Sequence, residues 1–307
     1  ASATLWSGAV AAAAMLLSLA MFAISRSLSS ISAKDVIGKT IPKGQRGSIT
    51  GIAAAISGVI AIAAGGAVAL LGGKTESTLL VAIVAGAAAL WVAAGGVFAT
   101  IEENRSSHDD TIGAEPIVSM LRRDPHFRRF IAARSLLLVT ALSPPLVIAL
   151  AASTSATLRG LGPFVIAAGT ASFLGSPVWG RLSDHSSRSV MAAAALGGGV
   201  IVFVFLFARQ LVGDPLWLTV TIYFLLAVAH AGARMGRKTY VVDMGTGDQR
   251  TNYVAASNTV IGVVLLGTGA ISTLTGVLGS QLTLGGLALA GVAGAFAARG
   301  LPEVEKA

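Results

Sequence analysis

The chain has 307 residues, of which 54% are hydrophobic and only 12% are charged. Soluble domains carry about twice that charged fraction, so the composition favours a membrane protein. Because the sequence has no cysteine, a disulfide framework and a thiolate metal site are both excluded, and the four histidines show no ligand spacing. The net charge of +8 is compatible with a nucleic-acid partner, a possibility that depends on where the basic residues lie.

Stretches of about 20 apolar residues indicate membrane helices. The sequence contains nine such stretches, which predict an all-α integral membrane protein. We expect helices at residues 4–26, 48–72, 78–101, 130–153, 160–181, 189–209, 215–235, 252–278 and 281–299.

The longest polar stretch, residues 102–129, separates three predicted helices from six and divides the chain into parts 1–101, 102–129 and 130–307. Two interpretations of its second half remain open. Arginines around Met120, Leu121 and Phe127 are typical of a short helix lying on an anionic membrane surface. They are equally typical of a solvated linker whose arginines only set the topology.

The basic residues gather on one side of the predicted bundle. Of the 22 Lys and Arg, only Lys74, Arg159 and Arg209 fall on the opposite side, which leaves 19 on the rich side. The positive-inside rule makes the rich side cytoplasmic, together with the linker and the C-terminus. The basic charge therefore indicates topology, and we expect no nucleic-acid partner.

The sequence also nearly repeats itself. Residues 34–72 align with residues 238–276 without a gap, and eight of the 39 positions match, including Arg46 with Arg250 and Gly58 with Gly262. Parallel halves of this kind are common in secondary transporters. The offset places the counterpart of the segment near Phe130 about 75 residues before Ala1. We therefore expect three further helices before Ala1, and we expect residues 1–307 alone not to transport.

A loop motif lies between the fifth and sixth predicted helices, where the sequence runs Gly180-Arg-Leu-Ser-Asp184-His-Ser-Ser-Arg188-Ser189. It resembles the loop signature of the major facilitator superfamily, G-x-L-[AS]-D-[RK]-x-G-[RK]-[RK]. The matching positions are Gly180, Leu182, Asp184 and Arg188, whereas His185, Ser187 and Ser189 depart from the pattern. Residues 128–151 and 232–262 further resemble the seventh helix and the tenth-to-eleventh loop of a bacterial facilitator subgroup.

The resemblance implies a facilitator-type bundle of two pseudo-repeated halves, in which the nine predicted helices are family helices 4 to 12. It further implies transport of a small solute by alternating access across the cytoplasmic membrane of a bacterium. The implied partners are the solute, the lipid bilayer and a coupling proton or other ion, with no cofactor. The alternative is a membrane scaffold or assembly protein of the same fold.

The motif has a physical logic as a conformational latch. A glycine lets two helices approach closely, and an aspartate can accept hydrogen bonds from a helix N-terminus or pair with an arginine. We expect Asp184 to contact the start of the 252–278 helix or a basic residue before it. The candidate partners are Arg234, Arg237 and Arg250. In the alternative, Asp184 and Arg188 only set topology.

Facilitators bind their cargo near the membrane midplane, between the halves. Pro144 and Pro145 remove two amide donors in mid-helix, so this helix must kink or break beside Ser143. Such irregularity is tolerated at membrane depth only against protein or a wet cavity, and a substrate site and a structural kink both remain open. The candidate cavity residues are Thr140, Ser143, Pro144, Pro145, Thr170, Ser172, Tyr223 and Asn258.

Two of the polar residues have structural alternatives. Asn258 suits helix–helix bonding as well as cargo binding, and His230 suits a structural hydrogen bond better than proton relay. All 14 acids lie in loops or near helix ends, so a proton-coupling carboxylate is either outside this sequence or not used. We expect no enzyme activity, because no catalytic constellation emerges: the sequence has no nucleophile elbow, no HExxH and no paired intramembrane carboxylates. Gly267–Gly269 lies in an apolar span with no preceding strand, so it is no dinucleotide fingerprint.

Overall fold

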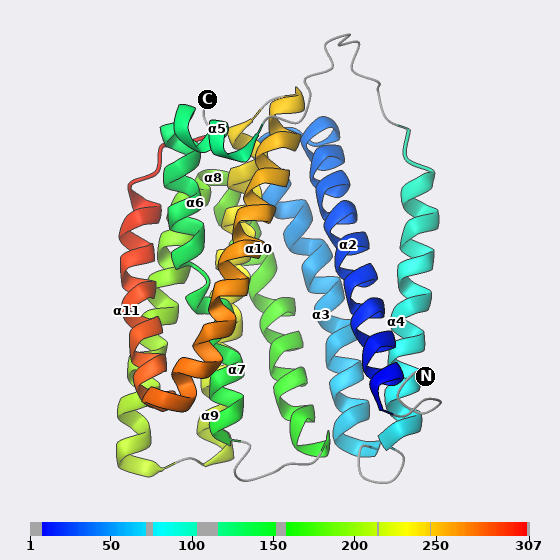
Figure 1. The fold of residues 1–307 in the computed structure, drawn as a ribbon, viewed down its shortest axis with the longest axis vertical. Coiled ribbons are helices and arrows are strands. Elements are labelled where there is room, and N and C mark those ends of the chain that lie inside the picture. Colours follow the sequence, from blue (N-terminus) through cyan, green and yellow to red (C-terminus); the bar gives the residue numbers. More distant parts are fainter. Residues whose placement is uncertain are drawn as a thin grey trace.

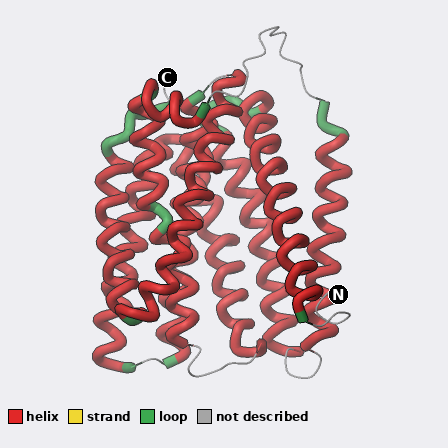
Figure 2. Tube along the Cα trace, viewed as in Figure 1, coloured by secondary structure: helices red, strands yellow, loops and turns green. Residues whose placement is uncertain are grey.

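The computed structural model describes residues 8–71, 76–102, 116–151, 158–213, 215–245 and 247–305, and within these ranges every regular element is a helix (Figures 1 and 2). The helices are α2 (Ala9–Thr40), α3 (Arg46–Leu71), α4 (Glu76–Ala99), α5 (Ile117–Arg123), α6 (Pro125–Leu136), α7 (Val139–Ala151), α8 (Leu158–Val212), α9 (Leu216–Met244), α10 (Gly247–Leu278) and α11 (Ser280–Arg299). Most run side by side along one axis as a bundle.

Seven helical segments in the described ranges are long and apolar enough to cross a membrane. They are Ala9–Thr40, Arg46–Leu71, Thr78–Ala99, Pro125–Leu150, Gly160–Val212, Leu216–Met244 and Ser280–Arg299. The prediction of an all-α membrane protein is confirmed at this level, whereas the count of nine spans stays a prediction. Gly160–Val212 covers two predicted spans. They are separated by a kink at Ser186, where the backbone of α8 leaves helical geometry (φ −163°, ψ 96°). The predicted span 252–278 falls in α10, which is not among the seven.

Two helices extend further than the sequence predicted. The predicted spans ended at residues 26 and 235, but α2 continues to Thr40 and α9 to Met244. The apolar pattern stops at the first charges, whereas backbone hydrogen bonding does not, since Lys and Arg are good helix formers. Lys34, Arg237 and Lys238, which lie outside the predicted spans, therefore lie on helices.

The segment before α6 forms the short helix α5, as one of its two interpretations predicted. Met120 on α5 is 4% exposed and Phe127 on α6 is fully buried in the protein core. Asp124 caps α6 by accepting hydrogen bonds from the backbone N–H groups of His126 (2.8 Å) and Phe127 (3.0 Å). Met120 and Phe127 are thus packed against the bundle, which contradicts a wholly solvated linker, whereas the placement of this helix on a membrane surface stays a prediction.

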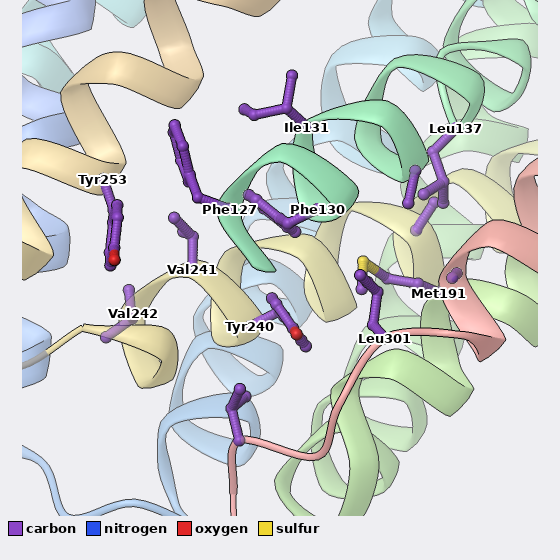
Figure 3. Packing of buried hydrophobic residues seen from close by; sticks show 14 of the residues in the cluster. Phe127, Phe130, Ile131, Leu137, Met191, Tyr240, Val241, Val242, Tyr253 and Leu301 are labelled. Carbon is purple, nitrogen blue, oxygen red and sulfur yellow. The ribbon is translucent and has the colours of Figure 1, made fainter. Parts of the chain in front are cut away.

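An aromatic core fixes one end of the bundle (Figure 3). The ring of Phe127 stacks on Tyr253 of α10 at 4.9 Å, and that of Phe130 stacks on Tyr240 of α9 at 5.1 Å. Met191 of α8 and Leu301 after α11 belong to the same cluster. This end also carries the α2–α3 and α9–α10 connections, the bend of α8 and the C-terminus, and is called the charge-rich end below (Figure 1).

Helix α3 packs on the part of α8 that precedes Ser186, backbone against backbone. A Cβ atom added to Gly51 would lie 2.5 Å from the carbonyl oxygen of Ser176, and one added to Gly58 would lie 2.6 Å from that of Gly169. Only glycine permits so close an approach. Helix α3 and the first part of α8 are thereby held together along their length. This packing positions the loop motif beside the start of α3.

Candidate functional site

The loop motif caps a helix at the charge-rich end. The Asp184 carboxylate, which is 9% exposed, accepts hydrogen bonds from the backbone N–H groups of Gly47 (2.6 Å) and Ser48 (2.8 Å) and from the Ser48 hydroxyl. These are unpaired donors of the first turn of α3, where the helix dipole also favours a negative charge. One of the two expected kinds of contact, a carboxylate on a helix N-terminus, is therefore present.

The expected partner was wrong. Asp184 binds the start of α3 rather than that of α10, and its hydrogen-bond partners do not include Arg234, Arg237 or Arg250. The starts of α3 and α10 are equivalent in the repeat, so the motif alone does not choose between them. The choice is made by the glycine-mediated packing of α8 on α3, which brings the bend of α8 to Gly47.

Two other motif residues have structural roles that the sequence suggested in part. A Cβ atom on Gly180 would lie 2.4 Å from the carbonyl oxygen of Gly47, so this glycine allows the close helix approach beside the cap. Leu182 is 48% exposed. Arg188 turns the other way: its Nε donates to Glu303 (2.7 Å) and its guanidinium also donates to the carbonyl of Leu301 (2.6 Å).

The segment after α11 binds the bend of α8, an arrangement that no sequence signal indicated. Glu305 accepts hydrogen bonds from the backbone N–H (2.7 Å) and hydroxyl of Ser187, and Glu303 accepts one from the Ser186 hydroxyl (3.0 Å). Partial burial acts to raise the pKa of Glu303, but the hydrogen bonds from Ser186 and Arg188 outweigh it and hold that pKa below its usual value. The segment after α11, residues 300–305, which is called the tail below, is therefore bound as an anion.

Repeat-equivalent arginines make equivalent hydrogen bonds beside the cap. The guanidinium of Arg46 donates to the carbonyl of Gly38 (2.7 Å), and that of Arg250 donates to the carbonyl of Val242 (3.1 Å). In each case the acceptor lies eight residues earlier, and the two acceptors are themselves related by the repeat offset. Arg46 additionally forms an ion pair with Asp243 at the end of α9.

At the charge-rich end, polar contacts between the predicted parts 1–101 and 130–307 add to the packing of α3 on α8. The Arg46–Asp243 pair links α3 to α9, and the Thr251 hydroxyl of α10 donates to Asp35 of α2 (3.2 Å). Lys43, between α2 and α3, donates to the carbonyl of Val304 in the tail (3.3 Å). Together with Asp184 on α3, these bonds can hold this end closed and must break if the halves separate there.

The predicted span that contains the double proline is interrupted, but at residues 137–138 rather than beside Ser143. Helix α6 ends at Leu136 and α7 begins at Val139, with a turn between them, while Pro144 and Pro145 lie inside α7. The Thr140 hydroxyl donates back to the carbonyl of Leu137 (2.9 Å) and contacts Nδ1 of His230 (3.2 Å). Ser143 is fully buried. The region joins α7 to α9, and its role in binding stays a prediction.

The other predicted cavity residues bond locally or to neighbouring helices. The Thr170 hydroxyl donates to Ile166 on its own helix (2.9 Å), and that of Ser172 donates to the carbonyl of Ala54 on α3 (2.9 Å). The rings of Tyr223 and Phe164 meet edge to face at 5.3 Å. Asn258 accepts a hydrogen bond from Arg134 of α6 (3.0 Å). These contacts hold helices together, and none of them joins the four residues into one site.

Comparisons with known proteins add no identity. Neither a scan against protein-family models nor a search of curated proteins gives a match for this chain. Among the described residues, no group of three or more His, Asp or Glu side chains is placed to hold a metal ion.

Proposed function

We propose that the protein is a secondary transporter of the major facilitator type, which moves a small solute across a membrane by alternating access. The observation that carries the proposal is the Asp184 cap, because it ties the loop of one half to a helix N-terminus of the other. Two backbone N–H groups hold the carboxylate strongly enough to favour one conformation. These bonds are few enough to break when the conformation changes.

The charge-rich end is the natural place for such a switch. It holds the interhalf bonds of Arg46 and Thr251 beside the Asp184 cap. In this proposal the charge-rich end faces the cytoplasm, the nine predicted spans correspond to family helices 4 to 12, and residues 102–129 connect the two halves. Opening then breaks the cap and the interhalf bonds together.

A transport assay tests the proposal directly. The full-length protein would be reconstituted into liposomes and offered a panel of radiolabelled sugars, amino acids, organic acids and inorganic phosphate. We expect saturable uptake of at least one class, abolished by its unlabelled form. A protein that inserts and folds normally but moves no member of the panel would instead fit the scaffold alternative.

The orientation has its own test, aided by the absence of cysteine. Ser107→Cys and Ser155→Cys lie in predicted loops on opposite sides, outside the described residues. An impermeant maleimide applied to intact cells should label only Ser155→Cys. Labelling of Ser107→Cys alone would reverse the assignment of the charge-rich end to the cytoplasm.

A further inference from the structure

Cationic side chains gather where α2 of the first half faces α6 and α9 of the second. Lys34 lies within electrostatic reach of Arg134, Arg237 and Lys238, and Arg234 lies within reach of Arg26. Lys34 and Arg134 are only 9% and 8% exposed. The cation cluster therefore comprises Arg26 and Lys34 on α2, Arg134 on α6, and Arg234, Arg237 and Lys238 on α9.

No described carboxylate pairs with the cation cluster. Asp35 pairs with Lys39 and Asp243 pairs with Arg46, and the charges that act on Lys34, Arg234 and Lys238 are other members of the cluster. A buried charge without a counter-ion is costly, and like charges held together repel. The arrangement is therefore complete only with an anion that the described part of the chain does not supply.

Two donors of the cluster are also unused. Arg134 donates to the hydroxyl of Ser257 (2.6 Å) and to Asn258 (3.0 Å), but its Nε is buried without a partner. The Nε of Arg234 is buried and unpaired as well. Buried guanidinium N–H groups are normally hydrogen-bonded, so these two point to a ligand with acceptor oxygens.

We propose that the cation cluster binds a phosphate-type oxyanion, and that this anion is the charged group of the transported solute. The proposal rests on the transport function proposed above. Guanidinium groups match the oxygens of phosphate in a fork, and lysines add point charge, so several of each favour a multiply charged oxyanion. A neutral sugar or a cationic solute has no complement in this arrangement.

The burial of the cluster favours a solute over a lipid headgroup. Lys34 and Arg134 are almost fully covered by protein. Arg134 donates to Ser257 and Asn258 of α10, inside the bundle. An anion that reaches Arg134 must therefore enter the bundle rather than stay at its surface.

The position of the cluster also connects cargo with conformation. Lys34 and Lys238 are equivalent in the repeat and belong to different halves, and each lies within reach of Arg237. Without an anion, repulsion between α2 and α9 favours separation of the halves. A bound oxyanion reverses the sign of that interaction and draws the halves together, as a transported ligand must do to drive closure.

Anion-dependent thermal unfolding tests the site. The full-length protein in neutral phosphatidylcholine nanodiscs would be melted in inorganic phosphate and in chloride at equal ionic strength and pH 7. We expect a saturable rise in melting temperature with phosphate, and at least a tenfold weaker apparent affinity for phosphate in Arg237→Gln. Arg129→Gln is the matched control, because Arg129 is exposed near the same end, and it should respond like the wild type.

Lys34→Gln gives a second reading should Arg237→Gln fail to fold, since it removes a cluster charge from the other half. An absent phosphate effect in the wild type would overturn the proposal. An equal effect in wild type, Lys34→Gln and Arg129→Gln would do the same, because the ion would then act on the surface only.

Further arms separate the source of the anion and the two proposals. If phosphatidylglycerol in the nanodisc abolishes the phosphate effect, a headgroup occupies the cluster and the assignment to cargo fails. If phosphate binds through the cluster but no solute of the panel is transported, the transport function fails and the anion site stands. If the protein transports an uncharged solute and Arg237→Gln leaves that transport unchanged, the transport function stands and the anion site fails as the cargo site.

Discussion

The α2–α3 and α9–α10 connections, called the two corners below, lie in the two copies of the same sequence repeat. They nevertheless bind different partners. Arg46 and Arg250 each bond a carbonyl eight residues earlier. Only Arg46 has an ion pair, with Asp243, and only the start of α3 is capped by Asp184. The repeat therefore gives both corners the same geometry, whereas the bonds that join them to other parts of the chain come from residues that the repeat does not share.

The same contrast continues along the helices that follow. Gly58 and Gly262 are equivalent in sequence, but a Cβ on Gly58 would meet the backbone of α8, whereas one on Gly262 would meet nothing within 4 Å. The Gly-rich pattern thus permits close packing without requiring it. Which copy uses the glycines depends on the neighbouring helix, and α3 has such a neighbour in α8.

Loss of Arg46 should have the largest effect, because it leaves a buried charge behind. The side chains of Arg46 and Asp243 are 7% and 0% exposed. Breaking such a pair from one side costs about 3–5 kcal/mol, so Arg46→Leu should lower the unfolding free energy in detergent by about that amount. The double variant Arg46→Leu/Asp243→Leu should recover most of the loss.

Arg250→Leu is the matched variant at the other corner. It removes a charged hydrogen bond to a carbonyl but strands no ion-pair partner, so its cost should be nearer 1.5–3 kcal/mol. Equal losses in Arg46→Leu and Arg250→Leu would mean that the Asp243 pair contributes nothing to the difference between the corners.

Asp184→Asn tests the cap as a switch. The variant keeps the shape but loses the charge, and a charge-assisted hydrogen bond of this kind contributes about 1.5–3 kcal/mol. A two-state equilibrium would shift about ten- to a hundredfold, so transport by the full-length protein should fall sharply while expression and insertion stay normal.

Two controls accompany the Asp184 variant. Ser48→Ala removes only one hydroxyl bond to the carboxylate and should have a weaker effect. Glu102→Gln removes an exposed carboxylate at the end of α4 and should have none. Transport at the wild-type rate in Asp184→Asn would show that the loop sets topology without controlling conformation.

The glycine pair offers a smaller and cleaner contrast. Gly58→Ala forces a methyl group against the carbonyl of Gly169 and should destabilise the protein by about 1–3 kcal/mol through overpacking. Gly262→Ala meets open space, and alanine is the better helix former, so that variant should be neutral or slightly stabilising. Thermal unfolding of both in the same detergent decides the matter, and equal shifts would contradict the packing difference.

The sequence predicted the helical membrane architecture because long apolar runs have few other folds open to them. It also predicted a helix N-terminus as one of two kinds of partner for Asp184, the other being an arginine of a neighbouring loop. It did not predict which helix, because the starts of α3 and α10 carry the same Gln-Arg signal. Only the packing of α8 on α3 separates the two.

Helix ends and the cation cluster escaped prediction for a related reason. Hydropathy ends a span at its first charges, so Lys34 and Lys238 fall outside the predicted spans. The structure continues α2 and α9 past them and brings the two lysines together from positions 204 residues apart. The tail contacts of Glu303 and Glu305 had no signal, because acids outside the apolar spans are normally solvated.

Acidification should weaken the binding of the tail, and we expect this to cause the smallest loss of stability among these tests. It extends the comparison, because the tail contacts both corners. Lys43 of one corner donates to the Val304 carbonyl (3.3 Å), and Tyr240 of the other donates to that of Pro302 (3.2 Å). The folded-state pKa of Glu303 is lowered, so its contribution is present above the unfolded pKa of about 4.3 and is lost as pH falls through the lower folded value.

A partly exposed ion pair contributes only about 0.2–1 kcal/mol, so we expect a modest effect. Between pH 5 and pH 3, thermal unfolding of the wild type should lose slightly more stability than that of Glu303→Gln, which has no charge to lose at this position. Asp124, whose pKa is also lowered by hydrogen bonds that outweigh its burial, titrates in both proteins and cancels in the comparison. Parallel pH profiles would mean that the docking of the tail does not depend on the Glu303 charge, and that its other bonds alone join the two corners.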